Sequence, residues 1–215
     1  VSGKFLKDTD GDGAGWDFDA TLDGKGPETE DGAHKLLEKL LGADFKVEDI
    51  EETEGTKANP VPFTTAALQI EANSKLGFAS RTTMSAAQGL YQAGLITYHR
   101  TDSLNLSNQA IGAISSYIED NYGKEYLKVR NFKTKDASAQ EAHEAIRPTN
   151  IAVENAGKNT YEQHLYALIR ARALSTQMAD AELAKTTLTI STPTEYVFEG
   201  KGEVVTFDGF LKVYG

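Results

Sequence analysis

Cysteine is absent from the 215-residue sequence, and its absence excludes two classes of site. Without thiols the chain can form neither disulfide bonds nor thiolate metal centres, so a bound metal would need oxygen or imidazole ligands. Long hydrophobic runs are also lacking, since no apolar stretch approaches the roughly 20 residues that cross a bilayer. The first residues, Val1–Gly3, do not begin a signal peptide. We therefore expect a cytoplasmic protein with no membrane partner.

Net positive charge is lacking as well, which at first argues against a nucleic-acid partner. The chain carries 22 Lys and Arg against 32 Asp and Glu, a net charge of −10 at pH 7, whereas binding to a phosphate backbone needs a positive surface. The acid is unevenly distributed. Residues 1–56 hold 16 Asp and Glu and 6 Lys and Arg, and the remainder holds 16 of each kind. The charge balance thus permits a DNA site after residue 56 without favouring one.

The pattern of apolar and turn-forming residues predicts β-structure at both ends of the chain and helices between them. Ser2–Leu22 is typical of a hairpin with its loop at Asp8–Gly15. Phe45–Ile50 alternates like a half-buried strand, Leu95–Arg100 predicts a short strand, and further strands are expected from Leu183 onward. Helical spacing predicts six helices, over Asp31–Leu41, Thr64–Lys75, Ser80–Ala93, Ser107–Tyr122, Ser138–Arg147 and Thr160–Met178.

Capping residues and a linker divide this pattern into domains. Asp31 and Ser107 are expected to be N-caps, and Thr160 with Gln163 is expected to form a capping box. The composition changes across Gly55–Pro60, which predicts a domain boundary there. We expect an α+β fold in which a mainly helical domain is inserted into a discontinuous β-rich domain, with divisions at 1–57, 58–184 and 185–215.

The segment Gly94–Ser103 is the most informative part of the sequence. If it is extended, Ile96, Tyr98 and Arg100 share one side and His99 faces the other. A tyrosine hydroxyl has a free pKa of about 10 and is a poor nucleophile unless positive charge stabilises the phenolate. Arg100 could supply that charge and grip a phosphate. On residue types alone, a Tyr beside an Arg is more often a packing pair.

Gly94–Ser103 resembles the active-site motif of type IA DNA topoisomerases, Gly-x-Ile-Thr-Tyr-x-Arg-Thr-Asp-Ser, at every fixed position. Gln140–Pro148 resembles the His-containing helix of the same family. Three further segments resemble the helices that precede the tyrosine: Pro60–Gln69, Lys75–Phe78 and Ala86–Tyr91. The similarity extends from about residue 44 to the C-terminus. Bacterial topoisomerase I and reverse gyrase share these motifs, and the former is favoured because no adjoining helicase feature is in view.

The resemblance implies a role for each site residue. Tyr98 would cut one DNA strand and form a 5′-phosphotyrosyl bond, and Arg100 would position the scissile phosphate and stabilise its charge. His143 would approach the phosphate from a helix that it shares with Arg147, which would contact the DNA backbone or close an ion pair. Asp102, which has the same parity as Tyr98 along an extended chain, would support the site. The partner would be a single-stranded segment of negatively supercoiled DNA, which implies a nucleoid-associated protein.

The resemblance also implies a winged-helix-like tyrosine domain inserted into a β-rich arch, and a metal site elsewhere. In this family Mg²⁺ is held by a Toprim domain, together with a lysine and a glutamate that assist proton transfer, and no segment here resembles that domain. We therefore expect no metal site in this chain and expect it to need the remaining domains of the same enzyme. Alone, it should not relax DNA.

Three alternatives remain open. Asp8, Asp10 and Asp12, with Asp19 at the twelfth position, fit part of an EF-hand calcium loop, although a hairpin turn explains the same residues. The helices of Thr64–Tyr122 could form a non-catalytic helix-turn-helix DNA-binding module. The β-rich segments could be a scaffold for partner domains.

Overall fold

The computed structural model describes residues 2–7, 16–132 and 143–215, and within this range the chain divides into two compact units. A β-rich unit comprises residues 1–55 and 182–206, and a helical unit comprises residues 56–181 and 207–215. The last nine residues therefore pack with the helical unit, whereas the sequence placed them with the β-rich domain. Because the arrangement of the two units is not determined, each is described separately.

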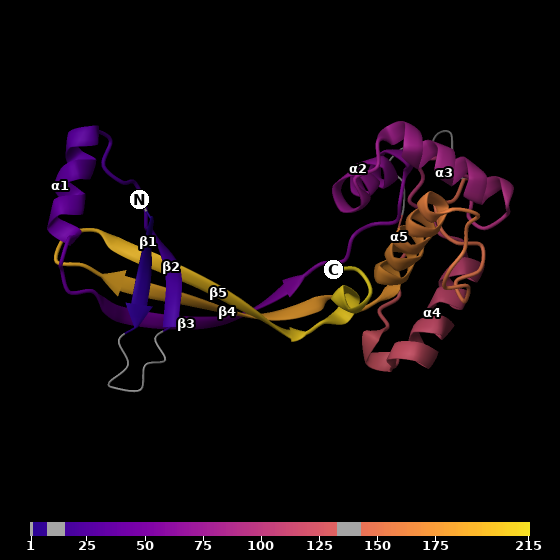
Figure 1. Ribbon diagram of the computed structural model, residues 1–215. Coiled ribbons are helices and arrows are strands. Elements are labelled where there is room, and N and C mark those ends of the chain that lie inside the picture. Colours follow the sequence, from indigo (N-terminus) through magenta and orange to yellow (C-terminus); the bar gives the residue numbers. More distant parts are fainter. Residues whose placement is uncertain (1, 8–15, 133–142) are drawn as a thin grey trace. The chain divides into compact units, whose positions relative to one another are not determined.

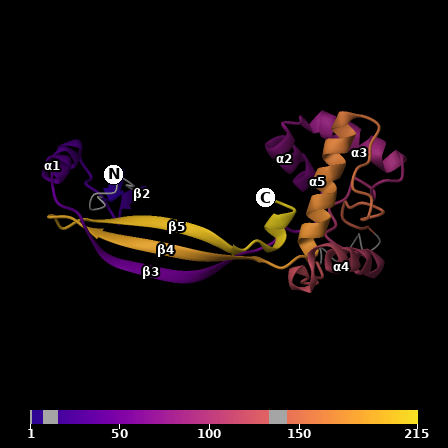
Figure 2. The ribbon, with the colours of Figure 1, turned by 60° about the horizontal axis from the view of Figure 1, so that its bottom comes forward.

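The β-rich unit is a five-stranded sheet in the order β1-β2-β5-β4-β3 (Figure 1). The expected hairpin is confirmed: β1 (Ser2–Lys7) pairs antiparallel with β2 (Trp16–Leu22), and Phe5 lies opposite Phe18. β2 in turn pairs antiparallel with β5 (Val197–Phe207). β4 (Ala181–Ser191) and β3 (Lys46–Lys57) complete the sheet, and Figure 2 shows these long strands running side by side with β5. Segments distant in sequence thus form one sheet.

The core of the β-rich unit is small and aromatic. Its central cluster is formed by Ala20, Ile190 and Phe198, and Leu36 and Leu183 are also buried in this unit. The ring of Phe5 contacts that of Phe198 at 5.5 Å and that of Phe45 at 5.1 Å between centroids, both edge-on. Helix α1 (Glu30–Leu40) adds Leu40 to this cluster. A few rings therefore supply most of the burial in this unit.

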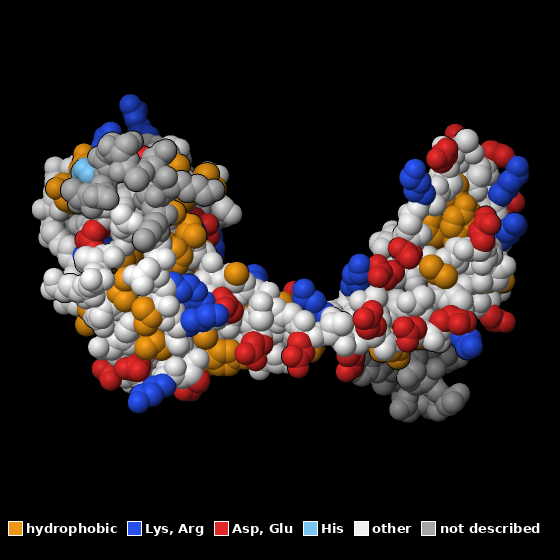
Figure 3. Space-filling view, turned by 180° about the vertical axis from the view of Figure 1, so that it is seen from behind, with side chains coloured by type: hydrophobic (Ala, Val, Ile, Leu, Met, Phe, Trp, Pro, Cys, Tyr) orange, Lys and Arg blue, Asp and Glu red, His pale blue; other side chains and the backbone are white. Residues whose placement is uncertain are grey.

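Strand β3 differs from its prediction as a half-buried strand. It extends beyond the predicted Ile50 to Lys57, which lies within the expected linker Gly55–Pro60. Its side chains are exposed along almost all of its length. β3 lies at the edge of the sheet, so it has only β4 beside it. Its five acidic residues face solvent, and Figure 3 shows such acidic side chains over the surface of this unit. Charge on an edge strand discourages pairing with another chain.

The helical unit packs four helices around one large core: α2 (Thr65–Leu76), α3 (Ser80–Gln92), α4 (Asn108–Tyr122) and α5 (Thr160–Gln177). α5 contacts the other three, and Figures 1 and 2 both show it among them. Short 3₁₀ turns follow at Lys124–Tyr126 and Gly209–Lys212. Leu165, Tyr166 and Ile169 of α5 are at most 1% exposed. Burial on nearly every side of α5 explains why it is the centre of this unit.

Local capping chemistry fixes where the helices begin. Thr64 and Ser107 cap α2 and α4 through their hydroxyls, which confirms Ser107, and Gly77 ends α2 in the left-handed conformation at φ 67°. Two predicted caps are wrong. Thr29, not Asp31, accepts from the amide of Gly32 at the start of α1. The cap of α5 is shifted by one residue from the predicted Thr160 and Gln163.

The correct pair at α5 is Asn159 and Glu162. The Asn159 side chain accepts from the Glu162 backbone amide at 3.0 Å. In return, the Glu162 carboxylate accepts from the side-chain amide of Asn159 and from the backbone amide of Lys158. Glu162 is only 7% exposed, so its carboxylate needs these donors. An asparagine with a glutamate three residues later is the same type of cap as the one predicted.

The expected α+β class is confirmed by a five-stranded antiparallel sheet in one unit and a helical bundle in the other. Over the described residues, no helix combines the length and apolar character needed to span a bilayer.

Candidate active site

The side chains of residues 98–103 alternate strictly between solvent and the interior. Tyr98, Arg100 and Asp102 are exposed, and Tyr98 is 41% exposed, whereas His99, Thr101 and Ser103 are buried. This alternation agrees with the predicted grouping of Tyr98 with Arg100 and Asp102. It excludes Ile96 from that group, because Ile96 is 1% exposed and lies in the core. The segment presents a phenol, a guanidinium and a carboxylate to solvent on one side.

The predicted strand at Leu95–Arg100 is reduced to a single bridge between Ile96 and Pro148. Beyond it, Thr97 is tied to the opposite segment three times. Its amide donates to the carbonyl of Arg147 at 2.9 Å, its hydroxyl donates to the carbonyl of Ala145 at 2.7 Å, and that hydroxyl accepts from the Arg147 amide at 3.0 Å. These bonds fix the backbone immediately before Tyr98.

Three aromatic rings meet at Tyr98. Its centroid lies 5.1 Å from that of Tyr91 on α3 and 5.4 Å from that of His99, both edge-on, and the Tyr91 and His99 rings are 5.8 Å apart. His99 therefore points into the unit, as expected, yet its ring touches that of Tyr98. Two neighbouring rings restrict the directions that the Tyr98 phenol can take.

His99 is fully buried, and neither of its ring nitrogens has a hydrogen-bond partner among the described residues. Burial lowers the pKa of His99 below its ordinary value of 6.5, and the positive charge of Arg100 lowers it further. The imidazole next to Tyr98 is thus neutral at neutral pH and acts as an aromatic packing group.

A groove of about 490 Å³ lies beside this segment. Arg100 and Asp102 line one side, and Met84 of α3 contributes an apolar wall. The start of α2 supplies its N-cap Thr64 and the first-turn residue Thr65. The N-terminal end of a helix carries partial positive charge and attracts anions. Arg100 and this helix end give the groove two sources of attraction for a phosphate.

The segment carrying His143 and Arg147 is not the predicted helix. Residues 143–147 are extended, with Ile146 bridged to Phe63, and residues 138–142 of that prediction lie outside the described residues. Pro148 disfavours the helical conformation of the residue before it, and the Ile146 side chain is buried in the core. His143 and Arg147 therefore do not share a helix face. His143 is exposed.

Arg147 closes an ion pair, one of the two possibilities expected for it. Its guanidinium lies 2.6 Å from a carboxylate oxygen of Glu144 and donates to the carbonyl of Pro148 at 2.9 Å. Glu144 also accepts from the backbone amide of Ser107 at 2.7 Å, which joins this segment to the start of α4. Burial acts to raise the pKa of Glu144, but the hydrogen bonds from Arg147 and Ser107 outweigh it and lower that pKa.

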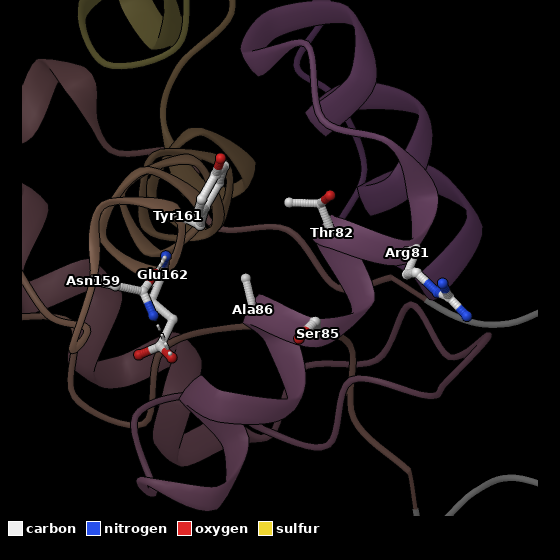
Figure 4. Close-up of a pocket in the computed structure, with 7 residues that line it drawn as sticks. All are labelled: Arg81, Thr82, Ser85, Ala86, Asn159, Tyr161 and Glu162. Atoms are coloured by element: carbon white, nitrogen blue, oxygen red, sulfur yellow. Dashed lines mark hydrogen bonds between the residues drawn. The ribbon is translucent and has the colours of Figure 1, made fainter.

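A second groove, of about 370 Å³, lies between α3 and the start of α5 and contains no predicted site residue (Figure 4). Arg81 and Ser85 come from α3, and Tyr161 and Glu162 come from α5. Figure 4 shows the Glu162 carboxylate turned toward Asn159, its capping partner, with Arg81 pointing away from both. The carboxylate in this groove is therefore already used by the helix cap.

The described residues contain no group of three or more His, Asp or Glu side chains that could hold a metal. A Mg²⁺ ion does not fit the residues around Tyr98, where Asp102 is the carboxylate of the groove. The calcium candidates Asp8, Asp10 and Asp12 lie outside the described residues. Asp19 is exposed within β2, opposite Lys4.

The sequence did not single out three residues that hold the site: Tyr91 packs against Tyr98, Glu144 pairs with Arg147, and Thr65 bonds to the backbone around Arg100. Glu144 lies in Gln140–Pro148 and Tyr91 lies in Ala86–Tyr91, two of the segments that resemble the family, but the sequence did not indicate their contacts. Thr65 forms hydrogen bonds to the motif backbone on both sides of Arg100. Its sequence signal was its place in Pro60–Gln69, one of the segments that resemble the family.

Comparison with known proteins gives a consistent result. Residues 4–215 match the DNA topoisomerase family. The chain is 42% identical over 184 residues to DNA topoisomerase 1 of Synechocystis, covering 83% of this chain and 20% of that protein. It is 41% identical over 216 residues to DNA topoisomerase 1 of Mycolicibacterium smegmatis, covering 93% of this chain and 23% of that protein.

A solved structure is similar over the whole chain. Full-length topoisomerase I from Thermotoga maritima matches 100% of this chain and 36% of its own, with 33% identity and a TM-score of 0.78. The chain thus spans about a fifth to a third of the length of these relatives.

Proposed function

The chain belongs to the bacterial type IA DNA topoisomerases, and from that premise we propose that it supplies the nucleophile with which such an enzyme cuts and rejoins one DNA strand. Its relatives are isomerases named DNA topoisomerase 1. The observation that carries the proposal is the outward side of residues 98–102. There, Tyr98 is 41% exposed on a backbone fixed by Thr97, and Arg100 follows on the same side beside an anion-attracting groove.

The proposed reaction is a reversible transesterification. The Tyr98 oxygen attacks the scissile phosphorus, a bond forms between that oxygen and phosphorus, and the bond from phosphorus to the 3′-oxygen breaks. The phenolic proton leaves as the attack proceeds, and a proton is delivered to the departing 3′-oxygen. Because a phenolate is a better leaving group than an alkoxide, the free 3′-hydroxyl can reverse the step without ATP.

Arg100 is proposed to bind the scissile phosphate and stabilise the charge that builds on it. Asp102, also lining the groove, is a supporting residue that orients the positive groups around it. His143 is proposed to reach the same phosphate from its exposed position immediately before the Glu144 anchor. Arg147 is proposed to act through its ion pair with Glu144, holding that segment in place while its remaining donors meet the DNA backbone.

The remaining steps belong to parts of the enzyme beyond this chain. Because the chain spans about a fifth of the length of the Synechocystis relative, strand passage and Mg²⁺ binding are assigned to further domains, including a Toprim domain. We propose that the helical unit is the winged-helix-like tyrosine domain and that the β-rich unit is part of the arch. The DNA substrate would be a single-stranded segment of negatively supercoiled DNA in the nucleoid.

A chimaera tests the proposal directly. This chain replaces the matching segment of the Thermotoga maritima enzyme, and a labelled single-stranded oligonucleotide is tested for covalent attachment after denaturation. The parent chimaera should form an adduct, and Tyr98→Phe should lose it completely while still binding DNA, because only the nucleophilic oxygen is removed.

Tyr91→Phe is the matched control, because Tyr91 is 40% exposed and in ring contact with Tyr98. Its adduct yield should stay near that of the parent chimaera. An adduct that persists in Tyr98→Phe would assign the nucleophile elsewhere. DNA binding by an active-site-intact chimaera that never forms an adduct would favour the non-catalytic DNA-binding module.

A further inference from the structure

Thr65, the first residue of α2, makes four polar contacts with the tyrosine motif, of which three can be hydrogen bonds at the same time because the hydroxyl has one proton. Its amide donates to the carbonyl of Thr101 at 2.8 Å. Its hydroxyl contacts the carbonyl of His99 at 2.8 Å and that of Thr101 at 3.1 Å, and accepts from the amide of Thr101 at 2.9 Å. The bonded groups lie immediately before and immediately after Arg100.

The pattern of donors shows why a hydroxyl is needed at this place. The Thr101 carbonyl already receives the Thr65 amide, so the single hydroxyl proton is best used on the shorter contact, to His99. The hydroxyl oxygen then remains free to accept from Thr101. One side chain thus fixes the residues on either side of Arg100, which itself has an exposed side chain.

The anchor is itself rigid. Thr64 caps α2 by accepting from the amide of Ala67 at 3.2 Å, and Leu68 in the next turn is fully buried. The two adjacent threonines therefore have different tasks, since Thr64 closes the helix and Thr65 holds the motif. Both line the groove that contains Arg100.

We propose that Thr65 is a positioning residue that holds Arg100 in the groove so that its guanidinium meets a phosphate of single-stranded DNA. The inference rests on the proposed function, because it assigns Arg100 to a phosphate. Thr65 does not touch the reacting atoms. It acts by removing backbone freedom around Arg100, and long side chains placed in this way bind with less loss of entropy.

The test measures binding of a fluorescein-labelled single-stranded oligonucleotide to the chain at fixed salt. Thr65→Val keeps the shape of the side chain but removes the hydroxyl, and should weaken binding about tenfold through the lost hydrogen bonds. Thr65→Ser restores the hydroxyl and should remain within about twofold of the wild type. Thr64→Val is the matched control, because it removes a hydroxyl from the neighbouring cap without touching the motif.

A double-mutant cycle separates positioning from simple destabilisation. In an Arg100→Ala background, Thr65→Val should weaken binding by less than about twofold, because the group that it positions is gone. Thr64→Val should have the same effect in both backgrounds. Thermal unfolding of each variant reports any loss of stability.

Each outcome decides the question. Equal effects of Thr65→Val in the two backgrounds would overturn the positioning role and leave Thr65 a structural residue. If Arg100→Ala leaves oligonucleotide binding unchanged, or the wild-type chain does not bind, Arg100 makes no phosphate contact for Thr65 to support and the inference fails at that step. Adduct formation by the chimaera, and its loss in Tyr98→Phe, reports separately on the proposed function. If Thr65 positions Arg100 on the bound phosphate, Thr65→Val in the chimaera should also slow adduct formation when DNA is saturating.

Discussion

The β-rich unit and the helical unit differ in how much side chain they remove from water. The central cluster of the β-rich unit is Ala20, Ile190 and Phe198, whereas that of the helical unit draws on every one of its helices. The candidate site lies wholly in the helical unit. A nucleophile and a phosphate-binding group need a fixed geometry, and a large core with anchored loops provides it.

The largest expected effect compares one leucine from each unit. Leu165→Ala in α5 should lower the free energy of unfolding by about 2–5 kcal/mol, because Leu165 is fully buried in the large core. Leu37→Ala in α1 should change it by less than about 0.5 kcal/mol, because Leu37 is 51% exposed. Urea unfolding followed by circular dichroism measures both. Equal losses of unfolding free energy would show that the β-rich unit is stabilised by side chains that are half exposed, such as Leu37.

A pair of glycines tests backbone rather than side-chain packing. Gly209 has φ 48°, and a Cβ there would collide with the carbonyl of Asp180, so Gly209→Ala should cost about 1–3 kcal/mol. Gly202 in β5 has no atom within 4 Å of an added Cβ, so Gly202→Ala should be neutral or slightly stabilising. Thermal unfolding compares the two variants. A costly Gly202→Ala would mean that the strands of the β-rich unit are more tightly constrained than their exposure indicates.

The smallest effect is a pH dependence located in the helical unit. The folded pKa of His99 lies below 6.5, so as the pH falls through 6.5 the unfolded chain takes up a proton that the folded chain does not. Neutral His99 therefore causes no loss of stability above pH 6.5. As the pH falls from 6.5 to the lower folded pKa of His99, stability is lost. As the pH falls across this window, the free energy of unfolding of the wild type should decrease more than that of His99→Met. Parallel pH profiles for the two proteins would contradict a buried neutral imidazole.

Local signals in the sequence were enough for most helices. α2, α3 and α4 begin and end within a residue or two of their predicted bounds, because capping residues and apolar spacing act over a few residues. The prediction failed at residues 143–147, where bridges to Phe63 and the burial of Ile146 override helical spacing. It failed again at β3, since position in the sheet, which local alternation does not encode, decides whether a strand is half-buried.

The candidate site shows the same division. Resemblance of Gly94–Ser103 identified Tyr98 and Arg100 as a pair, and parity along an extended chain grouped them with Asp102. No local pattern indicated that Thr65 would bind the backbone on both sides of Arg100, or that Tyr91 and His99 would pack against the Tyr98 ring. Those contacts join residues far apart in the chain.

The sequence by itself determined the family, the tyrosine proposed as the nucleophile and the side of the motif on which that tyrosine lies, because these depend on residue order and on the two-residue period of an extended backbone. Only the tertiary structure decided which groups hold that motif in place. Hydrogen bonds from α2 to the backbone around Arg100, and the pairing of Thr97 with the segment of Arg147, form only when the helical core has brought these segments together.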